Sequence, residues 1–186
     1  MRPLVFLLEE PSAKDALEGF LPTILPENAE ITYLVFEGKQ DLEKRMARTM
    51  RAWQKADARF VVMRDQDSGD CKLIKQGLLA RCREAGSADR AVVRIACREL
   101  ESWFLGDWAA VGQAFNLPRL AAMGGKAIYR DPDRLGSPVA ELRKVIPTYQ
   151  KRDGARRIGP YLSTDVNRSN SFVVFAEAVR RLAVEA

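Results

Sequence analysis

The chain has 186 residues, a length that suits one domain with a hydrophobic core of its own. It contains 30 basic and 25 acidic residues, and the net charge of +5 permits an anionic partner without requiring one. Three cysteines without a CxxC spacing, and no histidine, exclude a zinc site of the usual kind and predict reduced thiols in a cytoplasmic protein. The first apolar run is too short to span a membrane, so we expect no membrane attachment.

Four short apolar runs recur in the first half of the chain, at residues 3–8, 31–36, 60–63 and 91–97. They are near-continuous rather than alternating, which is typical of strands covered on both faces. The segments between them carry apolar residues at helical spacing, such as Leu42, Met46 and Met50. This β-α-β-α-β-α-β order predicts an α/β fold, with a parallel sheet of about four strands and helices on both faces. We expect the first strand to lie between the second and third, and the fourth beyond the third.

The pattern changes after residue 97. A helix is predicted from about residue 100 to 115, with Leu100, Phe104 and Trp108 on its apolar face. A loop-rich segment with several Gly and Pro follows at residues 116–163, and a last amphipathic helix carries Phe172 and Phe175. We therefore expect an α/β core at residues 1–115 and a loop-rich, helical extension at residues 116–186. The extension should pack on the core to give a single compact unit.

Acidic residues follow three of the four predicted strands. They are Glu9 and Glu10 after the first, Asp65, Asp67 and Asp70 after the third, and Glu99 and Glu101 after the fourth. Ligands of open parallel sheets bind outside the carboxyl ends of the strands, where these acids would meet at the ~4.8 Å spacing of paired strands. Carboxylates so close repel one another unless a cation neutralises them. Oxygen ligands without histidine or cysteine favour Mg²⁺ or Mn²⁺, although Asp, Ser and Gly after a strand are also ordinary turn residues.

Two of these motifs resemble those of a known family. Leu8-Glu9-Glu10-Pro11-Ser12 is similar to the glutamate motif of Toprim domains, the catalytic module shared by topoisomerases, primases and the overcoming-lysogenisation-defect nucleases. Asp65-Gln66-Asp67 resembles their Asp-x-Asp motif. The likeness covers residues 3–105 and implies a Toprim, Rossmann-like sheet. The residue after the motif glutamate is usually glycine and here is Glu10, so the motif glutamate is either Glu9 or Glu10.

A second likeness spans nearly the whole chain. It rests on Asp65-Gln66-Asp67 with Asp70-Cys71, Glu99-Leu100-Glu101-Ser102-Trp103, Tyr149-x-Lys151 and Ser169-Asn170-Ser171-Phe172. These motifs are similar to those of a bacterial family of uncharacterised Toprim-like proteins, often encoded beside ATPases in phage-defence or mobile loci. The resemblance implies a Mg²⁺-dependent nuclease that cleaves DNA or RNA and works with an ATPase as its partner protein.

The resemblance also implies roles for single residues. Asp65, Asp67 and Glu101 would ligate the metal, and Glu9 would ligate a metal or act as general base on the attacking water. Lys151 would neutralise phosphate oxygens, and the basic segment 143–157 would hold the nucleic-acid backbone. Structural interpretations remain open beside these. Glu101 can simply begin a helix, where an acid favours the helix dipole, and Lys151 can be a surface residue.

Other functions also stay open. In haloacid-dehalogenase phosphatases an Asp-x-Asp motif lies at the first strand, whereas here it follows the third. In some nucleotide-sugar glycosyltransferases such a pair holds Mn²⁺, which would leave Glu9 without a role. A non-catalytic subunit of an ATPase assembly would keep the fold and use none of the acids for chemistry.

Overall fold

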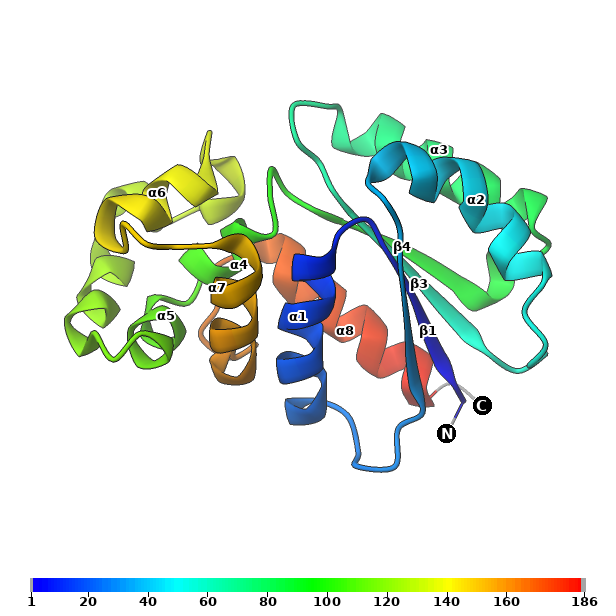
Figure 1. The fold of residues 1–186 in the computed structure, drawn as a ribbon, viewed down its shortest axis with the longest axis horizontal. Helices are drawn as coiled ribbons and strands as arrows, with labels where there is room; N and C mark the ends of the chain where they lie inside the picture. Colours follow the sequence, from blue (N-terminus) through cyan, green and yellow to red (C-terminus); the bar gives the residue numbers. More distant parts are fainter. Residues whose placement is uncertain (1, 185–186) are drawn as a thin grey trace.

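The computed structural model describes residues 2–184, so residues 1, 185 and 186, at the ends of the two expected units, lie outside the described part. The protein has an α/β fold built on a four-stranded, all-parallel sheet (Figure 1). Its strands are β1 (Leu4–Leu8), β2 (Ile31–Val35), β3 (Arg59–Asp65) and β4 (Ala91–Ala96). The order β2-β1-β3-β4 confirms the predicted sheet. Within residues 2–184, no helix is both long and apolar enough to cross a membrane.

Helices cover both faces of the sheet, as predicted (Figure 1). They are α2 (Lys39–Arg51) and α3 (Cys71–Glu84) on one face, and α1 (Pro11–Phe20) and α8 (Asn170–Val184) on the other. Successive strand residues face opposite sides, so Val5 and Leu7 pack with α2 and α3, whereas Phe6 and Leu8 pack with α1 and α8. Because both sides are buried, every residue of β1 is apolar.

The third strand continues past its predicted end. The apolar run stops at Met63, but the ladder with β4 extends through Arg64 to Asp65. Because side chains alternate along a strand, Arg64 points to the α2–α3 side of the sheet and Asp65 to the α1–α8 side. The residues that follow β1 divide in the same way, with Glu9 beside Arg64 and Glu10 on the opposite side. This alternation separates Glu9 from Glu10 and Arg64 from Asp65 at the edge of the sheet.

The single helix predicted at residues 100–115 is wrong, because the structure has two short helices there. They are α4 (Glu101–Leu105) and α5 (Trp108–Ala114), and the break falls at Gly106 and Asp107. A side chain at Gly106 would overlap the side chain of Asn167 and the backbone of Ser169. The Asp107 carboxylate accepts a hydrogen bond from the Ala110 N–H at 3.0 Å and so caps α5. Both helices bury their apolar residues, which explains why the hydrophobic pattern runs on across the break.

The segment 116–163, predicted to be loop-rich, contains two α-helices. They are α6 (Pro138–Val145) and α7 (Lys151–Ile158), and turns of 3₁₀-helix make up much of the rest. Each helix has only eight residues, too few for a clear apolar period. Tertiary contacts stabilise α7, since Arg152 and Arg156 both pair with the carboxylate of Asp15 on α1. Figure 1 shows α7 standing beside α1, and residues from both halves of the chain share the core on this side of the sheet.

Docking of α7 on α1 requires a close backbone approach at Gly159, where an added Cβ would overlap the carbonyl of Ala16. We therefore expect Gly159→Ala to lower the free energy of unfolding by about 1–3 kcal/mol, measured by urea denaturation. Gly125→Ala is the matched control, because no atom lies within 4 Å of its added Cβ. Equal stability of the two variants would contradict this view of the α1–α7 contact.

Candidate site at the carboxyl edge of the sheet

Charged side chains from separate elements gather in two groups at the carboxyl edge of the sheet, one on each side of it. The Lys151 cluster comprises Glu10, Asp65, Glu101, Tyr149 and Lys151. The Arg64 cluster comprises Glu9, Lys39, Glu43, Arg64, Asp67 and Arg81. The structure thus divides the four acids proposed as metal ligands, with Asp65 and Glu101 in the first group and Glu9 and Asp67 in the second.

The Lys151 cluster is built around the carboxylate of Glu101, which is 0% exposed. The Tyr149 hydroxyl donates a hydrogen bond to Glu101 Oε1 at 3.1 Å, and Tyr149 is itself buried. Glu101 Oε2 has no hydrogen-bond partner among the described residues. Lys151 Nζ lies 3.9 Å from that oxygen and 3.7 Å from Glu10 Oε1. Such a buried oxygen is costly without a partner, and a proton, a water molecule or a cation would each satisfy it.

The Lys151 cluster holds more negative than positive charge. Burial raises the pKa of Glu101 to about 7, even though the Lys151 ammonium acts in the opposite direction. Burial, together with the charges of Glu10 and Glu101, raises the pKa of Asp65 well above its ordinary value. Burial alone would lower the pKa of Lys151, but Glu101 and Glu10 raise it overall. One ammonium therefore faces three carboxyl groups, an imbalance that protons or an added cation would relieve.

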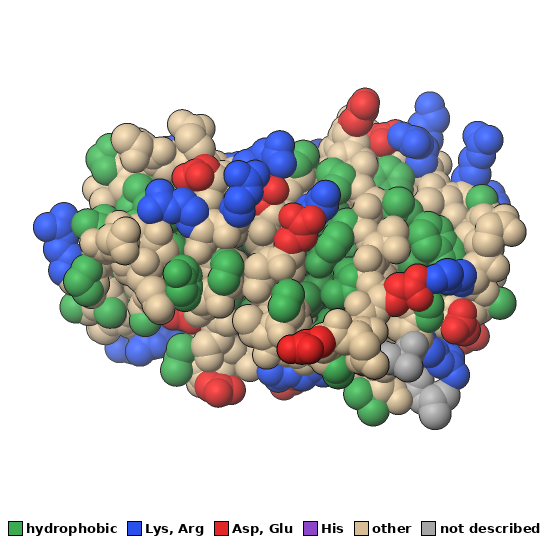
Figure 2. All heavy atoms as spheres, turned by 60° about the horizontal axis from the view of Figure 1, so that its bottom comes forward, with side chains coloured by type: hydrophobic (Ala, Val, Ile, Leu, Met, Phe, Trp, Pro, Cys, Tyr) green, Lys and Arg blue, Asp and Glu red, His purple; other side chains and the backbone are tan. Residues whose placement is uncertain are grey.

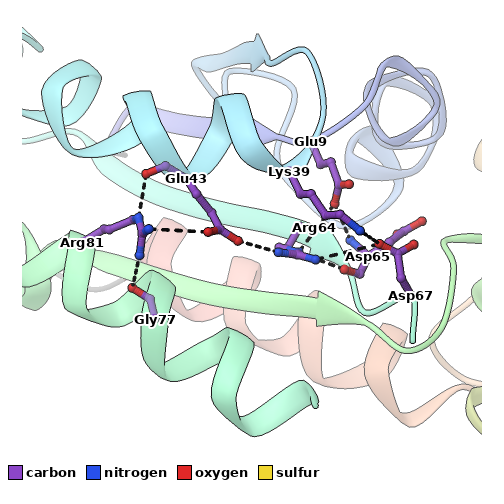
Figure 3. Close-up of polar contacts among 8 residues, drawn as sticks. All are labelled: Glu9, Lys39, Glu43, Arg64, Asp65, Asp67, Gly77 and Arg81. Atoms are coloured by element: carbon purple, nitrogen blue, oxygen red, sulfur yellow. Dashed lines mark hydrogen bonds and ion pairs between the residues drawn. The ribbon is translucent and has the colours of Figure 1, made fainter. Parts of the chain in front are cut away.

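The Arg64 cluster fixes the other acids (Figure 3). Arg64 is only 6% exposed, and its guanidinium bonds Glu43 Oε1 at 2.6 Å and the Asp65 carbonyl at 3.0 Å. It also lies 3.7 Å from Glu9 Oε2 and 3.9 Å from Asp67 Oδ2. Burial raises the pKa of Glu9. Two interactions act against that rise: the Asp65 N–H donates a hydrogen bond to Glu9 at 3.0 Å, and Arg64 carries the opposite charge.

Two further cations complete this group. Lys39 at the start of α2 pairs with Asp67 at 2.8 Å, and Arg81 of α3 pairs with Glu43 at 3.5 Å (Figure 3). Sequence reasoning did not find the roles of Arg64, Lys39 or Glu43. The position of Arg64 in the sequence could have indicated its role. It lies between an apolar strand and the Asp-x-Asp motif, and if the strand continues through it, its buried charge requires a partner.

Two non-glycine residues hold the loops of the site in left-handed backbone conformations. They are Asp67, with φ 54°, and Arg98, with φ 63°, and the Asp67 N–H donates to the Arg98 carbonyl at 2.8 Å. Such conformations are uncommon outside glycine and persist where the surroundings impose them. An open hollow of about 230 Å³, lined by Asp67, Ser68, Arg98, Glu99 and Gly136, borders these loops. The site therefore has room beside it for part of a ligand.

Three other acids near the edge have ordinary structural roles. Asp70 caps α3 by accepting hydrogen bonds from two backbone N–H groups, and Asp107 caps α5. Glu99 Oε2 accepts a hydrogen bond from the Val139 N–H at 3.0 Å, in the first turn of α6. Of the two candidates after β4, Glu101 thus belongs to the Lys151 cluster, whereas Glu99 accepts a hydrogen bond from the backbone at the start of α6.

The basic segment 143–157 is largely occupied by structural contacts. Arg152 and Arg156 pair with Asp15, and Arg157 donates to the carbonyl of Ala114 at 2.9 and 3.1 Å. On the face shown in Figure 2, basic and acidic side chains are interspersed, and no large patch of one charge forms. The expected role of this segment in holding a nucleic-acid backbone stays a prediction, and few of its cations are free for it.

The Ser169-Asn170-Ser171-Phe172 motif stabilises the fold rather than the charged edge. Both serine hydroxyls bond the Asp133 carboxylate, at 2.6 and 3.1 Å. Ser171 Oγ also accepts a hydrogen bond from Trp103 Nε1 at 2.9 Å. This motif therefore anchors the start of α8 to the loop before α6, and Phe172 packs its ring against Trp103 and Phe20.

The donor chemistry of the Lys151 cluster fits a hard divalent cation. Its donors are carboxylate oxygens, and the unpartnered Glu101 Oε2 is the kind of atom that an added cation would satisfy. Within residues 2–184, however, no three acidic or cysteine side chains are already grouped as metal ligands. Binding would therefore require Lys151 or neighbouring side chains to shift.

The comparisons with known proteins show the family. A family model described as a domain of unknown function (DUF4276) matches residues 8–182. The chain belongs to this family. Neither the curated proteins nor the solved structures gave a match. The match covers both charged clusters, the strands β2, β3 and β4, and of β1 only its last residue, Leu8.

The raised pKa of Glu101 predicts how stability varies with pH in the absence of divalent ions. The folded protein keeps a proton on Glu101 up to pH about 7, whereas the unfolded chain releases it near pH 4.5. The free energy of unfolding therefore falls as the pH rises between these two values. Between pH 5 and 8 in EDTA, the wild type should lose up to about 3 kcal/mol relative to Glu101→Gln, measured by urea denaturation. The exposed Asp57→Asn should follow the wild type. Parallel pH profiles for wild type and Glu101→Gln would refute the assignment.

Removal of Arg64 should destabilise the protein, because it leaves Glu9 and Glu43 without their shared cation. We expect Arg64→Met to cost about 3 kcal/mol in denaturant titrations. Arg134→Met is the control, since its pair with Asp131 is exposed and should contribute less than about 1 kcal/mol. A stable Arg64→Met variant would show that the Arg64 cluster does not hold this edge together.

Proposed function

We propose that this protein is a metal-dependent phosphodiesterase, a nuclease that hydrolyses DNA or RNA with Mg²⁺ or Mn²⁺. The single observation that carries the proposal is the fully buried Glu101 carboxylate, which has one oxygen without a hydrogen bond and shares a single lysine with two further acids. The position agrees with the general rule that open parallel sheets bind ligands beyond the carboxyl ends of their strands. The resemblance of the Glu9 and Asp65-Gln66-Asp67 motifs to Toprim domains supplies the reaction class.

Asp65 and Glu101, with Glu10, are the residues that would hold the metal in the Lys151 cluster. Bound there, a divalent cation supplies charge neutralisation, activation of water and stabilisation of the negative charge that develops on the phosphoryl group. Lys151 stays protonated near neutral pH, because its neighbours raise its pKa, and its ammonium is placed to contact phosphate oxygens. The Tyr149 hydroxyl fixes the orientation of Glu101.

Glu9 and Asp67 would serve the same reaction from the other side of the sheet edge. In the structure, Arg64 and Lys39 neutralise them. Arg64 is thus a positioning residue for both acids, and the pair with Lys39 must open before Asp67 can ligate a metal. An ATPase partner remains part of the proposal, on the strength of the family resemblance.

The non-catalytic alternative also has an observation in its favour. Glu9 and Asp67 are already neutralised, and a ready-made group of three ligands is missing within residues 2–184. A subunit that uses this edge only to bind a partner would need no metal. Metal binding and cleavage separate the two functions.

Mg²⁺ and Mn²⁺ should raise the melting temperature at pH 8. At a hundred times the dissociation constant the gain is about 2.7 kcal/mol, which corresponds to several degrees for a chain of this size. Asp65→Asn and Glu101→Gln should abolish the rise, whereas Asp57→Asn, which changes an exposed acid, should keep it. Differential scanning fluorimetry against EDTA provides the measurement.

The same variants should then be compared for cleavage of plasmid DNA and structured RNA, with and without the product of any neighbouring ATPase gene. Asp65→Asn should lose cleavage by at least about a hundredfold, as expected for a group that holds the catalytic ion. If neither cation shifts the melting temperature, the nuclease proposal fails. If the cation binds and nothing is cut under any condition, the non-catalytic subunit is the better account.

A further inference from the structure

A hollow lies away from both charged clusters, along α2 and the edge strand β2. Its volume is about 680 Å³, within the range of small-molecule sites, and its lining is Leu34, Lys44, Arg45, Arg48, Thr49, Ala52 and Trp53. A second hollow of about 370 Å³ also has Ala52 and Trp53 in its wall, with Gln54 and Lys55. Trp53 therefore lines both spaces, and no acidic residue lines either of them.

The cations of this hollow are available to a ligand. Lys44 and Arg48 are exposed, lie one turn apart on α2 and pair with no acid among the described residues. Arg45 beside them is already oriented, because it pairs with Asp41 at 3.0 Å and lies over the ring of Phe36. Two unpaired cations one helical turn apart provide a site for a phosphate group.

Trp53 is the unusual residue of the site. The other two tryptophans are almost completely buried, at 1% and 2% exposure, whereas Trp53 is partly exposed beyond the end of α2. Its ring packs edge-on against Phe60, with the centroids 6.3 Å apart. Its Nε1 is buried and, like that of Trp108, has no hydrogen-bond partner among the described residues, so the exposed part of the indole is apolar ring. A partly exposed indole beside unpaired cations can serve as a platform for a nucleobase.

We propose that this hollow binds a nucleotide unit, with the base stacked on Trp53 and the phosphate held by Lys44 and Arg48. The inference goes beyond the proposed nuclease, because it needs neither a metal nor the acids at the carboxyl edge. The ligand has two possible sources with the same chemistry, a free nucleotide or one unit of a single strand of DNA or RNA.

Intrinsic fluorescence tests the inference, because Trp53 is the partly exposed tryptophan of the chain. In EDTA, adenosine 5′-monophosphate should quench the emission, adenosine should bind at least about tenfold more weakly, and inorganic phosphate alone should quench nothing. A ten-nucleotide single strand of deoxyadenosine forms the second arm. Quenching by the mononucleotide would show that a free nucleotide is sufficient for binding. Quenching by the oligonucleotide alone would show that the ligand is a nucleic-acid strand.

Variants connect the signal to the site. Lys44→Ala with Arg48→Ala should weaken binding by at least about tenfold, whereas the exposed Arg119→Ala should bind as the wild type does. Trp53→Phe keeps an aromatic ring against Phe60 and should weaken binding of a fluorescently labelled ligand in anisotropy titrations, with an unchanged melting temperature as the check on folding. Asp65→Asn should bind normally, so failure of the nuclease proposal leaves this test intact. Absence of quenching by both ligands, or full binding by the Lys44→Ala, Arg48→Ala variant, would overturn the inference.

Discussion

The two-residue period of the β-strands determines the arrangement of this site. Consecutive residues at a strand end point to opposite sides of the sheet, so Glu9 and Glu10 diverge, and so do Arg64 and Asp65. Asp67 lies beyond the end of β3 in a left-handed backbone conformation, which brings it to the Arg64 side although it is two residues from Asp65. The acids form two groups, each with its own cations, and a metal centre at this edge must either use one group or draw residues around the strand ends.

The two groups differ in how their charge is balanced. On the α2–α3 side, the three cations Arg64, Lys39 and Arg81 match the three carboxylates of the cluster, and the side chains form a network (Figure 3). On the α1–α8 side, the single ammonium of Lys151 faces three carboxyl groups, one of which is fully buried. A network with matched charges stabilises the structure. Burial and neighbouring carboxylates raise the pKa of a carboxyl group that has no matching cation, and such a group favours an added cation. This difference in charge balance is the reason why the proposed metal site is placed on the Lys151 side.

The sequence predicted the sheet well and its surroundings less well. Continuous apolar runs identified the four strands, most clearly β1, which is buried on both faces and apolar throughout. Their expected order was that of a parallel sheet with helical crossovers, and the structure has this order. The end of β3 was placed too early, since Arg64 and Asp65 are polar although both are buried. The break at Gly106 and the helices α6 and α7 were missed, because tertiary contacts such as Arg152 with Asp15 decide them. Glu101 and Lys151 were found through motifs. Their contact with each other could not be predicted, because 50 residues separate them in the sequence.

The helix α2 connects the two regions to which binding is assigned. Its first residue, Lys39, pairs with Asp67 at the carboxyl edge, and Trp53 follows its last turn. Thirteen helical residues span about 20 Å, so Trp53 lies that far along the helix axis from Lys39, whereas Lys44 of the same hollow is about 8 Å from it. A base stacked on Trp53 is far from the carboxyl edge, whereas a longer single strand would reach from Trp53 past Lys44 toward that edge. If the ligand at Trp53 is a single strand, the hollow guides a substrate to the carboxyl edge. If it is a free nucleotide, the hollow senses a separate small molecule.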